Sequence, residues 1–386
     1  MSTVLSSPNS GLPRMRPEAV LRLCIVLLAG ALVAVPALAA PDAATLETVA
    51  SLGLVESDTP VRDREGWRKP RKIVVRTNEE RLPWMREVVD GVELVAATTE
   101  AEAIAAAPGA DGLIGFCSAA ILDAGPDIRW IQLPYAGAER CVATPGVRER
   151  GILVTNAQRI YGPEIAEHVM AMLLMFSRGL TVYYAEQQKG VWSRSAVPEE
   201  RLWELTGKTM LVAGLGGIGT ETARRAHALG MNVIATRGSS REGPDFVSYV
   251  GLADELTELA ERADVVVNAT PLTPATRDIF NADFFARMKP TAYFINVGRG
   301  GSVVTDDLVE ALKSGAIAGA GLDVTEPEPL PEGHPLWSLP NVIITPHVAA
   351  GSDVRVGRLW LVMRENLRRY SAGEKMYSVV SVERGY

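Results

Sequence analysis

Cysteine and histidine are both scarce in this sequence, which holds three cysteines and four histidines among 386 residues. Cys24 lies in an apolar N-terminal run, so only Cys117 and Cys141 remain for the rest of the chain. Two cysteines do not make the disulfide framework of a small secreted domain, and they lack the clustered spacing of a zinc site. We therefore expect ordinary thiols, with one disulfide as the alternative, and no bound metal.

An excess of positive charge is also absent. The chain has 39 lysines and arginines against 46 aspartates and glutamates, which gives a formal net charge of -7. No basic stripe is available for a phosphate backbone, so a nucleic-acid partner is not expected. With 47% hydrophobic and 22% charged residues the chain can bury a core, and its length indicates more than one domain.

Long apolar runs are missing after residue 40. Before it, Arg14, Arg16 and Arg22 precede "LCIVLLAGALVAVPALA", which ends in small residues that signal peptidase could cut. We expect residues 1–39 to be a secretory signal peptide that exports the protein to the periplasm or out of the cell. An uncleaved membrane anchor is the alternative, although the run is shorter than the ~20 apolar residues that span a bilayer. If the segment is no leader, the protein is cytoplasmic.

The rest of the chain alternates between two kinds of pattern. Residues 40–70 are polar and rich in proline and charge, which is typical of a tether or an added surface segment. From Lys72 onward, short β-branched runs alternate with amphipathic stretches, and this predicts parallel βαβ units. The first expected strands after "KIVVR" are "VELVA", "GLIGF", "IRWIQL" and "GILVT". The second series is "TMLVAGL", "NVIATR", "DVVVNAT", "AYFINV", "GAGLD" and "NVIITP".

Two helical patterns frame the second series of strands. The segment "PEIAEHVMAMLLMFSRGL" after Gly162 is apolar nearly all round, which predicts a buried helix. Near the C-terminus, "VGRLWLVMRENLRRY" predicts an amphipathic helix that returns to the first domain. Strands that follow one another at intervals of about one helix predict a doubly wound sheet.

A glycine-rich turn follows the first strand of the second series. Gly214, Gly216 and Gly219 form the pattern G-x-G-x-x-G at the start of a helical pattern. The first permits a tight turn, the second lets a pyrophosphate approach main-chain N–H groups, and the third lets helix and strand pack closely. This context predicts a dinucleotide site, which includes Gly217 and Ile218; a turn without a ligand is the alternative.

The next strand, "NVIATR", ends in an arginine where NAD-binding enzymes usually carry an acid. That acid accepts hydrogen bonds from the ribose 2′-hydroxyl. Arg237 removes the charge that would repel a 2′-phosphate and offers a planar fork to pair with one. Ser239 and Arg241 add a hydroxyl donor and a second positive charge. We expect NADP(H), with NAD(H) as the second choice; the alternative is that these arginines are solvated surface residues.

Three polar segments follow later strands of the second series. They are "INVGRGGSVVTDDLVEAL", "GAGLDVTEPEPLPEGHPLW" and "NVIITPHVAAGS". Because parallel strands end at the same edge of a sheet, these segments are expected to face the nicotinamide.

With these motifs the sequence resembles the D-isomer-specific 2-hydroxyacid dehydrogenases from Lys72 to Tyr386. The similarity includes "LPYAGAER", "AEH", "ATPLTPATR" and the terminal "VVSVERGY". It implies that the catalytic arginine of the family is Arg299, its acid Glu328 and its histidine His347.

The chemistry of these side chains agrees with that assignment. Arg299 can bind the carboxylate of a 2-keto acid and polarise its carbonyl for hydride attack. His347 then donates a proton to the developing alkoxide, while Glu328 favours the protonated ring and fixes its orientation. Glu326 is a near neighbour that could be mistaken for the acid. His168, in "AEH", is expected to be structural.

The resemblance also implies the remaining site residues. The main-chain N–H groups of "YAGAE" would form an anion nest for the substrate carboxylate, or else a plain tight turn. The implied substrate-binding residues are Ala136, Gly137, Ala138 and Arg299. The further cofactor-binding residues are Thr270, Pro271, Thr276, Val297, Gly298 and Asp323, the last at the nicotinamide carboxamide.

The expected fold class is α/β, with a Rossmann cofactor domain (166–348) inserted into a flavodoxin-like substrate domain (71–165 and 349–386), both with parallel sheets. We predict an NAD(P)H-dependent reductase, preferably using NADPH, of a small 2-keto acid such as glyoxylate or hydroxypyruvate. "HPLW" and "PHVAAG" resemble the glyoxylate and hydroxypyruvate reductase branch. The resemblance implies a homodimer through the cofactor domain. The alternative is a non-catalytic NAD(P)-sensing binding protein of the same fold.

Overall fold

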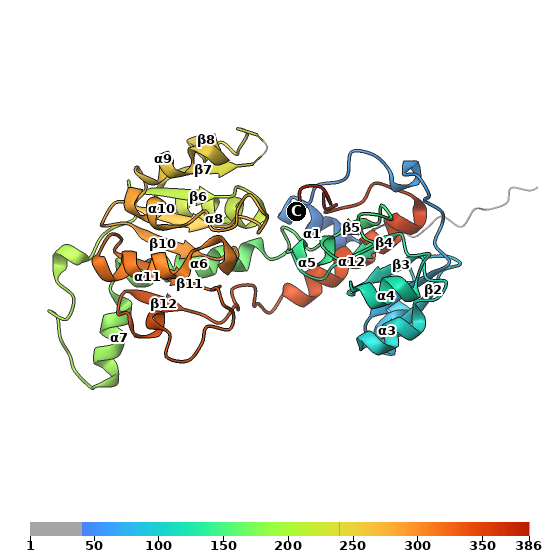
Figure 1. The fold of residues 1–386 in the computed structure, drawn as a ribbon, viewed down its shortest axis with the longest axis horizontal. Coiled ribbons are helices and arrows are strands. Elements are labelled where there is room, and N and C mark those ends of the chain that lie inside the picture. Colours follow the sequence, from blue (N-terminus) through green and yellow to red (C-terminus); the bar gives the residue numbers. More distant parts are fainter. Residues whose placement is uncertain (1–40, 239, 386) are drawn as a thin grey trace, which may run out of the picture. The chain divides into compact units, whose positions relative to one another are not determined.

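Two parallel β-sheets with helices on both faces make up the described part of the chain (Figure 1). The computed structural model describes residues 41–238 and 240–385, which all belong to one unit of the chain, Ala39–Tyr386. The predicted leader, residues 1–39, lies outside the described residues. The architecture confirms the predicted α/β class.

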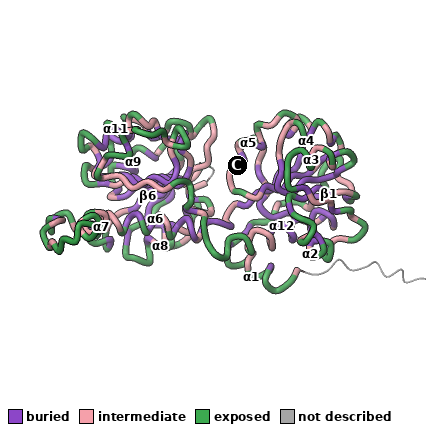
Figure 2. The backbone as a smooth tube through the Cα atoms, turned by 90° about the horizontal axis from the view of Figure 1, so that it is seen from below, coloured by how far each residue is buried: buried purple, intermediate pink, exposed green. Residues whose placement is uncertain are grey.

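The first sheet has the strand order β2-β1-β3-β4-β5, and every neighbouring pair is parallel. This is the flavodoxin-like order, as predicted. Its strands are β1 (Lys72–Arg76), β2 (Glu93–Ala97), β3 (Gly112–Ile114), β4 (Trp130–Gln132) and β5 (Leu153–Thr155). Figure 2 shows α3 (Glu100–Ala106), α4 (Ala119–Ala124) and α5 (Glu139–Val142) on one face, with α1 (Ala43–Leu52), α2 (Leu82–Arg86) and α12 (Arg355–Ala372) on the other.

The second sheet has the order β12-β11-β10-β9-β6-β7-β8 and is also parallel throughout. The chain reverses its direction of growth between β6 and β9, which is the Rossmann arrangement and places a ligand site at that switch point. Its strands are β6 (Thr209–Ala213), β7 (Asn232–Arg237), β8 (Tyr249–Leu252), β9 (Val265–Asn268), β10 (Tyr293–Asn296), β11 (Gly319–Leu322) and β12 (Val342–Ile344).

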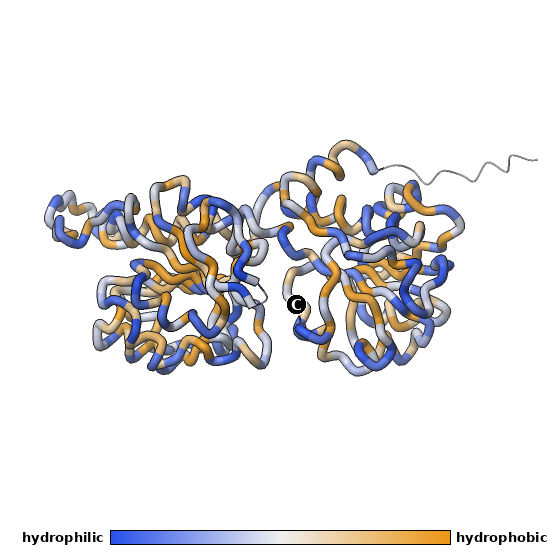
Figure 3. Tube along the Cα trace, turned by 90° about the horizontal axis from the view of Figure 1, so that it is seen from above, coloured by the Kyte–Doolittle hydropathy of each residue, from blue (hydrophilic) through white to orange (hydrophobic). Residues whose placement is uncertain are grey.

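Helices cover both faces of this sheet, which is why its central strands are continuous apolar runs. Helices α6 (Gly162–Ser177) and α8 (Gly217–Ala228) pack on one face. On the other face lie α9 (Leu256–Ala260), α10 (Ala282–Arg287) and α11 (Thr305–Ser314). Hydrophobic residues are accordingly concentrated along the strands, at the centre of each helix-covered sheet (Figure 3).

The predicted buried helix after residue 162 ends earlier than its apolar pattern does. Helix α6 stops at Ser177, and Gly179 adopts a φ of 61° at the start of α7 (Leu180–Gln188). In the described residues no single helix is long and apolar enough to cross a membrane. Helices α6 and α7 reach that length and hydropathy only when taken together, and the pair is bent by 73°.

Residues 41–70 are not a free tether. Helix α1 packs against α12, and Leu52, Leu54 and Val61 are buried. Glu56 forms a β-bridge with Tyr377 near the end of the chain. The segment is therefore an added surface layer of the first sheet, which is the second of the two sequence-based alternatives.

Two further expectations need correction. Strand β8 was not predicted, because "YVGL" is short and its edge position leaves Tyr249 partly exposed. The expectation of ordinary thiols was wrong, since Cys117 and Cys141 form a disulfide across 24 positions of sequence with their Cα atoms 5.6 Å apart. Two isolated cysteines carry no spacing signal, so only the fold brings them together.

Candidate functional site

The predicted glycine-rich turn joins β6 to α8. Gly214 has a φ of 91°, and Gly216 is the N-cap of α8. A Cβ atom on Gly219 would lie 2.1 Å from the carbonyl oxygen of Gly214, whereas a Cβ on Gly216 would meet nothing within 4 Å. The turn therefore leaves open space before the first N–H groups of α8, where backbone donors and the helix dipole favour a phosphate. A dinucleotide fits this turn.

Of the residues predicted to bind a 2′-phosphate, Arg237 ends β7 and Arg241 follows it, while Ser239 lies outside the described residues. The Arg237 guanidinium donates to a main-chain oxygen at 2.8 Å and forms no ion pair with a described residue. Arg241 instead pairs with Glu255 at 2.7 Å and donates to the Tyr249 hydroxyl. Hydrogen bonds from Arg241 and Tyr249 lower the pKa of Glu255 to about 2. Of Arg237 and Arg241, it is therefore Arg237 whose charge is not neutralised by an ion pair with a described residue.

No sequence motif singles out Arg159, yet it packs against Gly217 of the glycine-rich turn. Its φ is 70°, a left-handed conformation that few non-glycine residues adopt. A Cβ on Gly217 would lie 2.7 Å from the Arg159 Cγ atom. Burial lowers the pKa of Arg159, and the nearby charge of Arg237 lowers it further. The charge of Glu221 opposes this shift of the Arg159 pKa. The guanidinium has no hydrogen bond or ion pair to residues 41–238 or 240–385, so it is available to an anion.

The loop after β9 faces the same turn. The Thr270 hydroxyl donates to the Asn268 side chain at 2.7 Å, and the Thr276 hydroxyl donates to the Pro271 carbonyl at 2.6 Å. These bonds hold the loop in shape, so the Thr276 hydroxyl is engaged within it. Gly298, next to the buried Val297, lies so close that a Cβ on it would be 2.9 Å from the Thr270 carbonyl.

Arg299 follows β10 and contacts the predicted substrate loop. Its Nε atom donates to the Glu139 carboxylate at 2.9 Å, and its Nη1 atom donates to the Gly298 carbonyl at 2.8 Å. A Cβ on Gly137 would lie only 1.9 Å from the Nη2 atom, so the guanidinium occupies the space that this glycine leaves. Glu139 was not among the predicted site residues, because its partner lies 160 positions away in sequence.

The substrate loop also offers free backbone donors. The N–H groups of Ala136, Gly137 and Ala138 donate no main-chain hydrogen bond within the described residues. The Asn156 side chain holds the loop by donating to the Ala136 carbonyl at 2.6 Å. Free N–H groups beside a guanidinium suit a carboxylate ligand.

His347 follows β12 with a φ of 55°. Its Nδ1 atom lies 2.6 Å from the Glu328 carboxylate, and 51% of the imidazole side chain is exposed. The Nε2 atom faces no hydrogen-bond partner in the described part of the chain. Glu326 has its carboxylate near Gly301 instead. The carboxylate that meets the imidazole therefore belongs to Glu328.

The turn that carries His347 is held by Asp323. The buried Asp323 carboxylate accepts hydrogen bonds from the N–H groups of residues 348–349 and, at 2.7 Å, from the Thr345 hydroxyl. The Asp323 carbonyl accepts the N–H of His347 at 2.8 Å. His168 on α6 lies 2.9 Å from the Thr345 hydroxyl and supports the same turn. Asp323, predicted to meet the nicotinamide, thus also shapes the histidine turn.

One cleft contains most of these features. Its lining residues include the substrate loop, Arg159, the glycine-rich turn, Thr270, Pro271, Val297, Gly298 and Arg299. His347 and Glu328 are not among its lining residues. They follow β12 and β11, however, while Arg299 follows the adjacent β10. Strands are roughly 4.8 Å apart, so the ends of β10 and β12 are separated by about 10 Å at the same edge of the sheet.

Comparison with known proteins identifies relatives for this arrangement. The family model described as "D-isomer specific 2-hydroxyacid dehydrogenase, NAD binding domain" matches residues 170–349. The chain is 37% identical over 263 residues to the glyoxylate reductase/hydroxypyruvate reductase of Homo sapiens, which covers 67% of this chain and 79% of that relative. It is 33% identical over 266 residues to the glyoxylate reductase of Thermofilum pendens, covering 69% of this chain and 78% of the relative.

A solved structure is similar over nearly its whole length. The NADPH-dependent glyoxylate/hydroxypyruvate reductase from Sinorhizobium meliloti, in complex with NADP and sulfate, matches with a TM-score of 0.70 and 30% identity. The match covers 82% of this chain and 99% of that chain. This similarity agrees with the two-sheet architecture described above.

Proposed function

Because the chain belongs to the D-isomer-specific 2-hydroxyacid dehydrogenase family, we propose that it is an NAD(P)H-dependent reductase of a small 2-keto acid such as glyoxylate or hydroxypyruvate. The observation that carries this proposal is the placement of Arg299 and of the Glu328–His347 pair after three adjacent strands. Relatives named for glyoxylate and hydroxypyruvate reduction support the substrate class.

The side chains of the site divide the reaction between them. A bound dihydronicotinamide supplies the hydride. Arg299 binds the substrate carboxylate and polarises the adjacent carbonyl, with the free N–H groups of residues 136–138 as further donors. The Nε2 atom of His347 delivers the proton to the carbonyl oxygen, while Glu328 orients the ring through its contact with Nδ1.

NADP(H) is the proposed cofactor, with NAD(H) as the second choice. Strand β7 ends in Arg237 rather than in an acid, so the carboxylate that would repel a 2′-phosphate at this position is replaced by a guanidinium. Arg159 adds a second unpaired charge against the first turn of α8, on the side where the pyrophosphate would lie. The solved relative from Sinorhizobium meliloti carries NADP.

The test is a steady-state assay of purified protein with glyoxylate and hydroxypyruvate and either NADPH or NADH. Oxidation of the dinucleotide that depends on the keto acid, faster with NADPH, is the expected result. Saturable NADPH binding without turnover of any 2-keto acid would instead support an NAD(P)-sensing protein.

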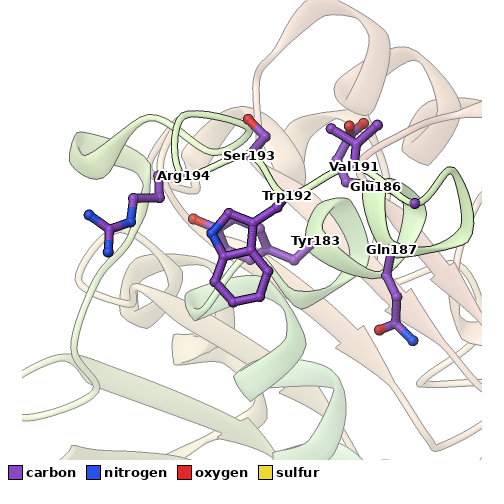
Figure 4. Close-up of a pocket in the computed structure, with 8 residues that line it drawn as sticks. Tyr183, Glu186, Gln187, Val191, Trp192, Ser193 and Arg194 are labelled. Carbon is purple, nitrogen blue, oxygen red and sulfur yellow. The ribbon is translucent and has the colours of Figure 1, made fainter.

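We also propose a homodimer formed through the cofactor domain. Helix α7 and the loop after it expose Tyr184, Val191 and Trp192, the last with 93% of its surface accessible. Figure 4 shows Trp192 beside Tyr183, with Arg194 pointing away from both. Exposed aromatic clusters of this kind are typical of interfaces. Analytical ultracentrifugation should detect a dimer that Trp192→Ala converts to monomer; a monomeric wild type contradicts it.

Export remains our proposal for localisation. The leader pattern predicted for residues 1–39 supports it, and the Cys117–Cys141 disulfide is consistent with an oxidising compartment. N-terminal sequencing of the native protein tests this, with cleavage after residue 39 as the expected result. Export would require that the dinucleotide be bound before translocation or supplied outside the cytoplasm; an intact leader would support the anchor or the cytoplasmic alternative.

A further inference from the structure

The guanidinium of Arg299, which follows β10 of the second sheet, is held by a carboxylate from helix α5, which packs on the first sheet. Glu139 accepts from Nε, and Gly298 accepts from Nη1, while the missing side chain of Gly137 leaves room for Nη2. Glu139 is the ion-pair partner of Arg299 among the described residues, and each side chain is about 30% exposed. The Nη2 edge is therefore left for a ligand, and Glu139 decides where that edge points.

The element that carries Glu139 has little stability of its own. Helix α5 spans four residues, and helices this short are unstable in isolation. Cys141 lies on the same helix, is 2% exposed, and is joined to Cys117 in the loop before α4. The disulfide therefore ties the helix that bears Glu139 to the first sheet.

We propose that Glu139 is a positioning residue for Arg299 and that the Cys117–Cys141 disulfide holds Glu139 in place. The proposal rests on the proposed function, which assigns substrate binding to Arg299. The N–H groups of an arginine donate in the plane of its guanidinium, so Arg299 meets a substrate carboxylate well only when that plane is fixed. The disulfide supplies this fixation through α5.

Two variants separate the role of the Glu139 oxygen from that of its charge. Glu139→Gln keeps an oxygen that accepts from Nε, whereas Glu139→Ala removes the acceptor of Nε and leaves only the bond from Nη1 to the Gly298 carbonyl. We expect Glu139→Ala to raise KM for the keto acid about tenfold or more, since a charge-assisted bond is lost, and Glu139→Gln to restore most of that loss. KM for NADPH should not change. Glu149→Gln, on the segment after α5 without contact to Arg299, is the matched control.

The role of the disulfide is tested by a double-mutant cycle. Cys117→Ser opens the disulfide at its more exposed end, and we expect it to raise KM for the keto acid by about threefold or more in wild type but not in a Glu139→Ala background. Dithiothreitol, which transfers two electrons and two protons and becomes a cyclic disulfide, should reproduce the Cys117→Ser value. Equal effects of Cys117→Ser in both backgrounds would overturn the coupling.

A binding measurement keeps this inference separate from the proposed function. Oxamate, an unreactive analogue of a 2-keto acid, is titrated into each variant with NADPH present. If wild type turns over no keto acid but binds oxamate more tightly than Glu139→Ala does, the proposed function fails and the positioning role stands. Equal oxamate affinity in wild type and Glu139→Ala, or no oxamate binding at all, overturns the positioning role.

Discussion

The Nδ1 atom of His347, a residue with a left-handed φ of 55°, lies 2.6 Å from the carboxylate of Glu328. One ring nitrogen is therefore committed to an acid, and the other is left to meet a substrate. A carboxylate–imidazole pair of this kind fixes the orientation of the ring.

His347→Asn should lower kcat about a hundredfold or more, because the general acid is lost. Asparagine tolerates a positive φ, so the turn should keep its shape. Glu328→Gln retains an oxygen near Nδ1 and should cost less activity. Steady-state kinetics check both, with NADPH affinity from fluorescence titration as the control. An undiminished kcat in His347→Asn would contradict the assignment of the proton donor.

Arg237 and Arg159 should respond differently to the choice of dinucleotide. Arg237→Gln should raise the Kd for NADPH by about tenfold or more and leave that for NADH unchanged, because only NADPH has the 2′-phosphate. Arg159→Gln should weaken both, since its side chain lies against the first turn of α8. Arg224→Gln, on the exposed side of α8, is the control. Equal losses for both dinucleotides in Arg237→Gln would refute the 2′-phosphate contact.

The difference between predicted and unpredicted site residues has a physical cause. The glycine-rich turn, Arg299 and His347 all follow strands with strong apolar patterns, so the rule that parallel strands end at one edge locates their segments in advance, and the family resemblance then selects Arg299 and His347 within them. Glu139 and Arg159 have no such local signal. Each acquires its role from a partner brought near by the fold: Glu139 from Arg299, and Arg159 from Gly217.

The same limit explains other differences between sequence and structure. Ser177 ends α6 although the apolar pattern continues, because Gly179 takes a left-handed conformation there. Arg241 is of the residue type expected at a phosphate site but pairs with Glu255, which lies in the turn directly after β8. Local patterns predict elements and their edges, whereas side-chain pairing depends on tertiary contacts.

Alanine substitution of two adjacent glycines in the dinucleotide turn should have different effects, one on stability and the other on NADPH binding. A Cβ on Gly217 would lie 2.8 Å from the Cα atom of Arg159, so backbone has to move, and Gly217→Ala should cost roughly 1–3 kcal/mol of stability. A Cβ on Gly216 would point into open space, so Gly216→Ala should keep the melting temperature and weaken NADPH binding instead.

Thermal unfolding without ligand and fluorescence titration with NADPH measure the two effects separately. A loss of stability in Gly216→Ala equal to that in Gly217→Ala would show that both glycines serve packing alone.

Acid should remove a stabilising contact of the C-terminal helix. In α12 the Arg368 guanidinium lies 2.6 Å from the Glu374 carboxylate, and hydrogen bonds from Arg368 lower the pKa of Glu374 below its usual 4.5. The unfolded chain therefore binds this proton more readily than the folded one does. The contribution of Glu374 to stability is fully present above pH 4.5 and is lost as the pH falls through the lower folded value.

Glu374→Gln should thus lower the urea midpoint of unfolding at about pH 7, and the difference from wild type should shrink steadily below pH 4.5. Glutamine does not titrate, so the variant already lacks the stabilising carboxylate charge that acid removes from wild type. Glu47→Gln, on the exposed side of α1 and without an ion pair in the described chain, is the control and should leave the midpoint unchanged. A difference between Glu374→Gln and wild type that stayed constant down to acid unfolding would mean that the Arg368–Glu374 pair does not stabilise the fold through its charge.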